Sequence, residues 1–157
     1  MNFDIKFDFQ RRDRLGLIEA IWGQDKSIDQ LERLSKNVLS KNEVVFITRI
    51  NSEKANHLTG LYDDARFYEE ASCLIIGKNL NKVNTKKKVA IISGGSSDLA
   101  VTREAQLALE IYGVNCQSFI DVGVAGLHRL MSQLEDCLLY TSPSPRDRTR
   151  SRMPSSA

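Results

Sequence analysis

The chain has 157 residues, 41% of them hydrophobic and 27% charged, and a formal net charge of +2. Its length suits one compact domain with a small appendage and excludes two full enzyme domains. No apolar run approaches the roughly 20 residues of a membrane span, and no basic leader precedes an apolar core, so we expect a cytoplasmic protein without a membrane partner.

The end of the sequence differs in composition from the rest. All three prolines lie in residues 137–157, where four arginines face Asp147 alone, so the net charge without this tail is −1. Two interpretations are a disordered tail and a basic arm that binds RNA. We favour a third, because residues 137–147 match one translated frame of a transposase sequencing adapter: the codons TGT CTC TTA TAC ACA TCT encode CLLYTS. On that interpretation residues 137–157 are adapter read-through, are not native, and follow a gene truncated near Asp136.

Hydrophobic spacing predicts helices near the start of the chain. Residues 12–22 are compatible with a short helix stopped by Gly23. Ser27 and Gln30 form a capping box, which predicts a second helix that ends near residues 41–42.

Strand signals follow. The β-branched run at residues 44–48 predicts a strand. Ser52 is then expected to begin a short helix that ends at Gly60. Residues 67–76 end in a second run of residues that is typical of a strand. Residues 79–88 are rich in lysine and asparagine without interleaved aromatic residues. They predict a solvated linker rather than a nucleic-acid contact.

The pattern is clearest after this linker. Residues 89–92 form an apolar run typical of a buried parallel strand and lead directly into a glycine- and serine-rich turn at 93–98. A helix is expected over 99–112, followed by a strand at 114–120. Strand, helix and strand make a βαβ unit, which predicts a parallel sheet and the α/β class.

Two small-residue turns are candidates for ligand binding. The turn at 93–98 offers backbone N–H groups and hydroxyls to an anion at a helix N-terminus, and a second turn at 121–126 follows the next strand and precedes another helix. Because neighbouring parallel strands end at the same edge of a sheet, both turns are expected to face one crevice. The plainer alternative is a strand-to-helix turn in which Ser96 or Ser97 serves only as an N-cap.

Charged side chains complete the predicted site. Asp98 and Asp121 can accept hydrogen bonds from ribose hydroxyls, while His128 and Arg129 bring a titratable ring and a cation. Alternatively, Asp98 only favours the first turn of a helix and His128 only packs against its neighbours. The predicted nucleotide- and phosphate-binding residues are Ser93, Gly94, Gly95, Ser96, Ser97, Asp98, Asp121, Gly123, Ala125, Gly126, His128 and Arg129.

The sequence does not predict a metal site. His57, His128, Cys73 and Cys116 are scattered without the spacing of metal ligands, and no disulfide framework is implied.

The two turn motifs resemble those of a known family. Residues 93–105 (SGGSSDLAVTREA) and 121–130 (DVGVAGLHRL) resemble the paired motifs of the LarB family of nickel-pincer cofactor biosynthesis proteins. The carboxylase domain of that family is similar to phosphoribosylaminoimidazole carboxylase (PurE) of the purine pathway, which has a shorter Ser-Ala-His-Arg form of the second motif. The resemblance extends over residues 10–136, with one departure at Ser72, where the family pattern leads us to expect an arginine that contacts substrate. The matching residues upstream are Gly16, Glu19, Gly23, Lys26, Thr48 and Arg49.

The resemblance implies a domain organisation. Residues 1–78 would form a small mixed N-terminal region, 79–88 the linker, and 89–136 the first part of a PurE-like, flavodoxin- or Rossmann-like, three-layer parallel-sheet domain. Intact members are expected to be homo-oligomers that contact no nucleic acid.

The resemblance also implies an activity. The family carboxylates the pyridinium ring of nicotinic acid adenine dinucleotide with CO₂ or bicarbonate and hydrolyses its phosphoanhydride, giving pyridinium-3,5-biscarboxylic acid mononucleotide and AMP, without a bound cofactor. Its catalytic cysteine is expected beyond residue 136, and neither Cys73 nor Cys116 matches that motif, so the truncated chain is expected to be inactive. Alternatives are a purine-type carboxylase or mutase, a non-catalytic nucleotide-binding module, and an RNA-binding protein that would depend on the arginine tail.

Overall fold

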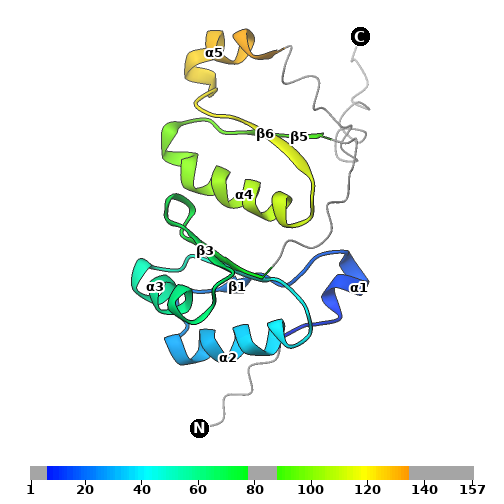
Figure 1. Cartoon of the computed structure of the whole chain (residues 1–157). Coiled ribbons are helices and arrows are strands. Elements are labelled where there is room, and N and C mark those ends of the chain that lie inside the picture. Colours follow the sequence, from blue (N-terminus) through cyan, green and yellow to red (C-terminus); the bar gives the residue numbers. More distant parts are fainter. Residues whose placement is uncertain (1–6, 78–87, 135–157) are drawn as a thin grey trace, which may run out of the picture.

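The computed structural model describes residues 7–77 and 88–134 (Figure 1). The first part contains the elements α1 (Arg11–Leu15), β1 (Ile21–Trp22), α2 (Ile28–Leu39), β2 (Val45–Thr48), α3 (Ser52–Leu61), β3 (Ala65–Tyr68), the 3-10 helix η1 (Glu69–Ala71) and β4 (Cys73–Ile76). The second part contains β5 (Lys88–Ile92), the 3-10 helix η2 (Ser96–Asp98), α4 (Leu99–Ile111), β6 (Asn115–Phe119), the 3-10 helix η3 (Val124–Gly126) and α5 (Leu127–Ser132).

The strands form two sheets. The first has the order β1-β2-β4-β3, in which β1 and β2 are parallel while β4 is antiparallel to both β2 and β3. The second is the parallel pair β5–β6, whose register runs from Lys88 opposite Asn115 to Ile92 opposite Phe119. The predicted βαβ unit and the α/β class are therefore confirmed.

The first sheet is covered on both faces, and its inner strand β2 is buried at every position. Val45 and Ile47 point into a core with α2 and α3, whereas Phe46 points to the opposite face. This division follows from the two-residue period of a strand. On the opposite face α4 contributes the buried Leu107 and Ile111. In Figure 1, α4 accordingly lies between the two sheets.

The prediction of a helix over residues 12–22 is wrong beyond the first turn of that helix. Helix α1 ends at Leu15, and Gly16 follows with φ +71°, a left-handed conformation that stops a helix. Ile21 and Trp22 instead form a strand beside β2, in which Ile21 is 4% exposed. Burial of Ile21 in a sheet therefore prevailed over a weak helical pattern.

The other predicted elements of this part need smaller corrections. The capping box of Ser27 and Gln30 is confirmed, and α2 ends at Leu39, slightly before the predicted end. The N-cap of α3 is Asn51 rather than Ser52, because the Asn51 side chain accepts from the Lys54 N–H, and Gly60 lies inside the helix rather than after it. The strand pattern predicted over 67–76 forms two strands, β3 and β4, around η1.

Two predicted regions fall largely outside this description. Of the expected linker at 79–88, only Lys88 is described, and it belongs to β5; the tail at 137–157 is not described. Within residues 7–77 and 88–134, no helix is long and apolar enough to span a membrane.

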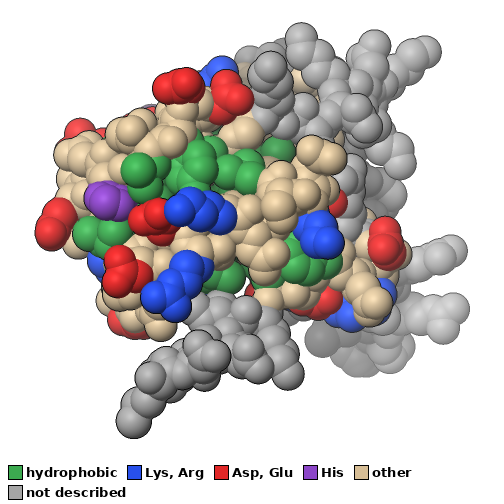
Figure 2. Space-filling view, turned by 60° about the horizontal axis from the view of Figure 1, so that its bottom comes forward, with side chains coloured by type: hydrophobic (Ala, Val, Ile, Leu, Met, Phe, Trp, Pro, Cys, Tyr) green, Lys and Arg blue, Asp and Glu red, His purple; other side chains and the backbone are tan. Residues whose placement is uncertain are grey.

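Figure 2 shows the face that carries α2 in Figure 1, turned forward. Lys and Arg side chains alternate there with Asp and Glu side chains, and hydrophobic side chains lie between them. On α2 itself, Lys36 pairs with Glu32 at 2.6 Å. The described residues of this face thus form no continuous basic track of the kind that binds a nucleic-acid backbone.

Candidate nucleotide site

The bends after β5 and β6 lie side by side. The Val122 N–H donates to the Ser93 carbonyl and the Gly123 N–H donates to the Gly94 carbonyl, both at 3.1 Å. A Cβ on Gly123 would lie 2.4 Å from the Gly94 oxygen, so only glycine permits this approach. The predicted convergence of the two turns is therefore confirmed.

The second bend is anchored by its own small core. Val122 is 4% exposed and packs with Phe119 at the end of β6, while Ala90 and Leu130 close the cluster from β5 and α5. Asp121 precedes this anchor with φ +61°, an unusual conformation for a residue that is not glycine. The bend is thus held firmly beside β5.

Asp98 stabilises the first bend through a hydrogen bond to the backbone. Its Oδ2 accepts from the Gly95 N–H at 3.1 Å, and η2 leads directly into α4. No side chain caps α4, so the alternative in which Ser96 or Ser97 serves as its N-cap is wrong. Both serines are exposed.

The fold itself does not require glycine at positions 94 and 95. A Cβ on Gly94 would come no closer than 3.8 Å to another atom, and a Cβ on Gly95 no closer than 3.6 Å, both ordinary contact distances. Neither residue has a positive φ. Alanine would therefore fit at either position in the structure as it stands.

A cavity of about 290 Å³ opens beside the first bend. Ser93, Gly94 and Asp98 line it; Ser93 is 8% exposed, and its Oγ has no hydrogen-bond partner among the described residues. An unpaired buried hydroxyl beside a cavity is a group that a bound ligand could satisfy. The remaining lining residues are Ile91, Ile92, Val101, Thr102 and Ala105.

The sequence pattern does not assign these remaining residues to the site. For three of them a signal exists, because Val101, Thr102 and Ala105 follow Asp98 at the helical spacing that puts residues on one face. Ile91 and Ile92 lie in β5 and carry no such signal.

The second turn contributes less to the cavity than predicted. Gly123, Ala125, Gly126 and their neighbours do not line it. Arg129 forms an ion pair with the Asp121 carboxylate, and its guanidinium occupies the space beside Gly126. His128 is exposed on α5. Of the twelve predicted residues, Ser93, Gly94 and Asp98 line the cavity and the other nine do not.

The described cysteines are poorly suited to nucleophilic roles. Burial raises the pKa of the Cys73 thiol to about 12, and the neighbouring Glu104 charge adds to this effect. Burial also raises the pKa of Cys116, with the Glu110 charge as a smaller cause. Because the thiolate is the reactive form, both side chains are held protonated at neutral pH. Within the described part of the chain, no cluster of metal-ligating side chains occurs.

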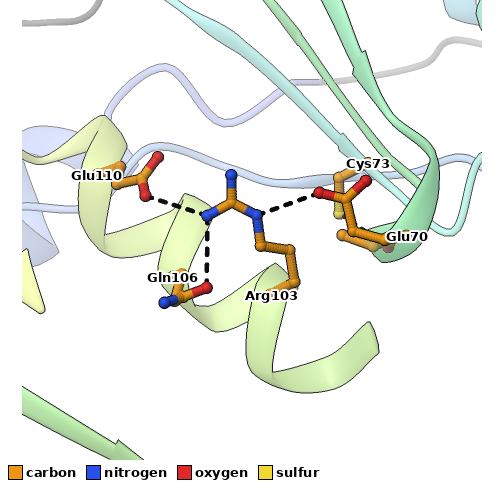
Figure 3. Close-up of polar contacts among 6 residues, drawn as sticks. Glu70, Cys73, Arg103, Gln106 and Glu110 are labelled. Carbon is orange, nitrogen blue, oxygen red and sulfur yellow. Dashed lines mark hydrogen bonds and ion pairs between the residues drawn. The ribbon is translucent and has the colours of Figure 1, made fainter. Parts of the chain in front are cut away.

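Polar contacts join α4, which follows the first bend, to the N-terminal sheet (Figure 3). Arg103 reaches from α4 to Glu70 of η1, with 3.3 Å between Nε and Oε1. Its Nη1 contacts Gln106 and Glu110 on the same helix, each at 3.3 Å, and its guanidinium carbon lies 5.4 Å from the Tyr68 ring centroid.

Comparisons with known proteins identify the first part of the chain. Residues 3–78 match the family model described as the LarB/PurE-like N-terminal domain. The uncharacterized protein MJ0165 of Methanocaldococcus jannaschii is 33% identical over 136 residues, which cover 83% of this chain and 53% of that protein. The chain therefore spans about half the length of this relative.

Proposed function

Because residues 3–78 match the LarB/PurE-like N-terminal domain, we propose that the bends after β5 and β6 bind a nucleotide. The family relationship is to carboxylases, so the whole protein is proposed to carboxylate that nucleotide. The observation that carries the proposal is the pair Gly94 and Gly95, which the fold does not require, beside a cavity with an unpaired buried hydroxyl. A close approach of ligand phosphate to the backbone explains glycine there.

The substrate proposed is nicotinic acid adenine dinucleotide, with CO₂ or bicarbonate as co-substrate. Carboxylation of the pyridinium ring and hydrolysis of the phosphoanhydride would give pyridinium-3,5-biscarboxylic acid mononucleotide and AMP. The 157-residue chain is proposed to bind the dinucleotide without turning it over, since both described cysteines are held protonated.

The residues of the first bend are suited to different parts of a nucleotide. Asp98 already accepts from the Gly95 N–H, and its negative charge would repel a phosphate, so it is better suited to a ribose hydroxyl. The Ser96 and Ser97 hydroxyls are exposed and can donate to phosphate oxygens. On the opposite side, Arg129 would reach a phosphate only by leaving Asp121.

Alanine substitutions at the two glycines test this proposal. Gly94→Ala and Gly95→Ala are expected to leave the thermal midpoint within a few degrees, because the added Cβ meets only ordinary contacts. Each should weaken binding of nicotinic acid adenine dinucleotide, measured by titration calorimetry, by about tenfold or more, because the methyl group displaces the phosphate from the backbone.

Gly60→Ala is the matched control, since a Cβ there meets nothing within 4 Å and the residue lies in α3, away from the bends. Its affinity should equal that of the unmodified chain. Unchanged affinity in the two bend variants, or no binding by the unmodified chain at millimolar nucleotide, would overturn the proposal. Tighter binding of aminoimidazole ribonucleotide than of the dinucleotide would instead favour the purine-type carboxylase.

A further inference from the structure

A second group of residues, around Trp22 and Arg49, lies on the same side of the molecule as the bends. In Figure 1 the chain leaves β2 toward α3 on the side where it also leaves β5 and β6 toward α4 and α5. Trp22 ends β1, and Arg49 directly follows β2. An ion pair between Arg49 Nε and Glu104 of α4, 3.6 Å long, places these residues beside the helix that the first bend opens.

This group is rigidly built. The Gly23 N–H donates to the Thr48 carbonyl at 2.8 Å, and a Cβ on Gly23 would lie 2.8 Å from Ile47, so the chain after Trp22 is packed tightly against β2. Lys54 of α3 then holds the next turn by donating to the carbonyls of Gly23 and Gln24. The Trp22 indole is oriented by its own hydrogen bond to the Asp25 carboxylate.

The two side chains are nevertheless open to solvent. The Trp22 residue is 49% exposed and the Arg49 side chain is 47% exposed, and the Arg49 guanidinium carbon lies 6.0 Å from the Trp22 ring centroid. Arg49 also has φ +54°, an unfavourable conformation for a residue with a side chain. A rigid frame that presents a large aromatic ring and a cation, at a conformation better suited to glycine, is typical of a ligand contact.

Glu104, which pairs with Arg49, lies six residues after Asp98, the last residue of η2. Six residues correspond to about 9 Å along a helix axis, so this ion pair lies roughly that far along the helix from the first bend. A ligand with two nucleotide units can span such a distance, whereas a single phosphate at the bend cannot reach it.

We propose that Trp22 and Arg49 bind the second half of the dinucleotide, with one of its rings stacked on Trp22 and a neighbouring anionic group on Arg49. This inference rests on the proposed function. It assigns to the N-terminal domain a direct part in substrate binding and explains why Arg49 keeps an unfavourable backbone conformation.

Fluorescence provides a local probe, because Trp22 is the one tryptophan in the chain. Titration with nicotinic acid adenine dinucleotide should quench its emission with the same midpoint that calorimetry gives. Arg49→Gln should weaken binding about tenfold, as expected for loss of a charge-assisted hydrogen bond, without lowering the thermal midpoint. Arg33→Gln, on the exposed surface of α2, is the matched control and should bind normally.

Glu104→Gln separates a binding role from a merely structural one. This variant breaks the same ion pair as Arg49→Gln but keeps the cation, so its affinity should be unchanged or higher. Equal weakening in both variants would show that the ion pair alone matters and would overturn the inference.

The two proposals fail in different ways. If Gly95→Ala abolishes binding while Arg49→Gln binds normally and Trp22 emission does not change, the present inference is wrong and the proposed function stands. If the unmodified chain does not bind the dinucleotide at all, both are wrong.

Discussion

The two described parts of the chain differ in how they bury hydrophobic surface. The first sheet is covered on both faces, and β2 and β4 are buried at every position. Among the described residues, the core of the β5–β6 unit has two buried side chains, Phe119 and Val122, with Ala90 and Leu130 packed against them, and the unit exposes several large hydrophobic side chains. They include Ile92 (57%), Val101 (56%), Val124 (94%), Leu127 (55%) and Met131 (58%).

The difference shows how the second part is stabilised. Its helix α4 places Leu107 and Ile111 in the core of the N-terminal sheet rather than in a core of its own. Because burial of apolar area is the main favourable contribution to folding, the β5–β6 unit depends on the N-terminal sheet for its stability. The bends after β5 and β6 are therefore held in position partly by residues far from them in the sequence.

The largest effect is expected from Leu107→Ala. Leu107 is fully buried where the two parts meet, so truncation should lower the free energy of unfolding by about 2–5 kcal/mol, measured by urea denaturation. Val101→Ala, on the exposed part of the same helix, should change it by at most about 0.5 kcal/mol. Separate transitions for the two parts in the unmodified chain would contradict the proposed dependence.

A smaller effect, confined to the second part, is expected from Gly123→Ala. Its Cβ would collide with the Gly94 backbone oxygen, and overpacking of this kind costs about 1–3 kcal/mol. Gly126→Ala is the comparison, because the three atoms nearest to its Cβ would all belong to the end of the Arg129 side chain, which can rotate away. Thermal denaturation should rank the two variants in that order, and the opposite ranking would show that the bends are not held together as described.

The βαβ unit could be predicted from the sequence because its signals are local. An apolar run, a glycine-rich turn and a helical pattern each occupy adjacent residues, and chain connectivity then fixes the parallel pairing. Strand β1 could not be predicted in this way. Ile21 and Trp22 form a strand only because β2, more than twenty residues later, offers them a free edge.

The same distinction holds for the candidate site. The approach of Gly123 to Gly94 followed from topology, since both lie at carboxyl ends of neighbouring parallel strands. The pairing of Arg129 with Asp121 and the position of Arg49 beside Trp22 depend on side-chain packing and on turns with positive φ. No periodic pattern in the sequence reports such contacts.

The smallest change in stability is expected from the ion pair that joins α4 to the N-terminal part of the chain. Glu70→Gln removes the ion pair that Arg103 makes across the boundary, whereas Glu110→Gln removes one within α4. The Glu70 and Glu110 side chains are 51% and 47% exposed, so each change should cost at most about 1 kcal/mol and less in high salt, as urea denaturation at two salt concentrations would measure. If Glu70→Gln instead destabilised the protein as strongly as Leu107→Ala, the boundary would be held by charge rather than by apolar packing.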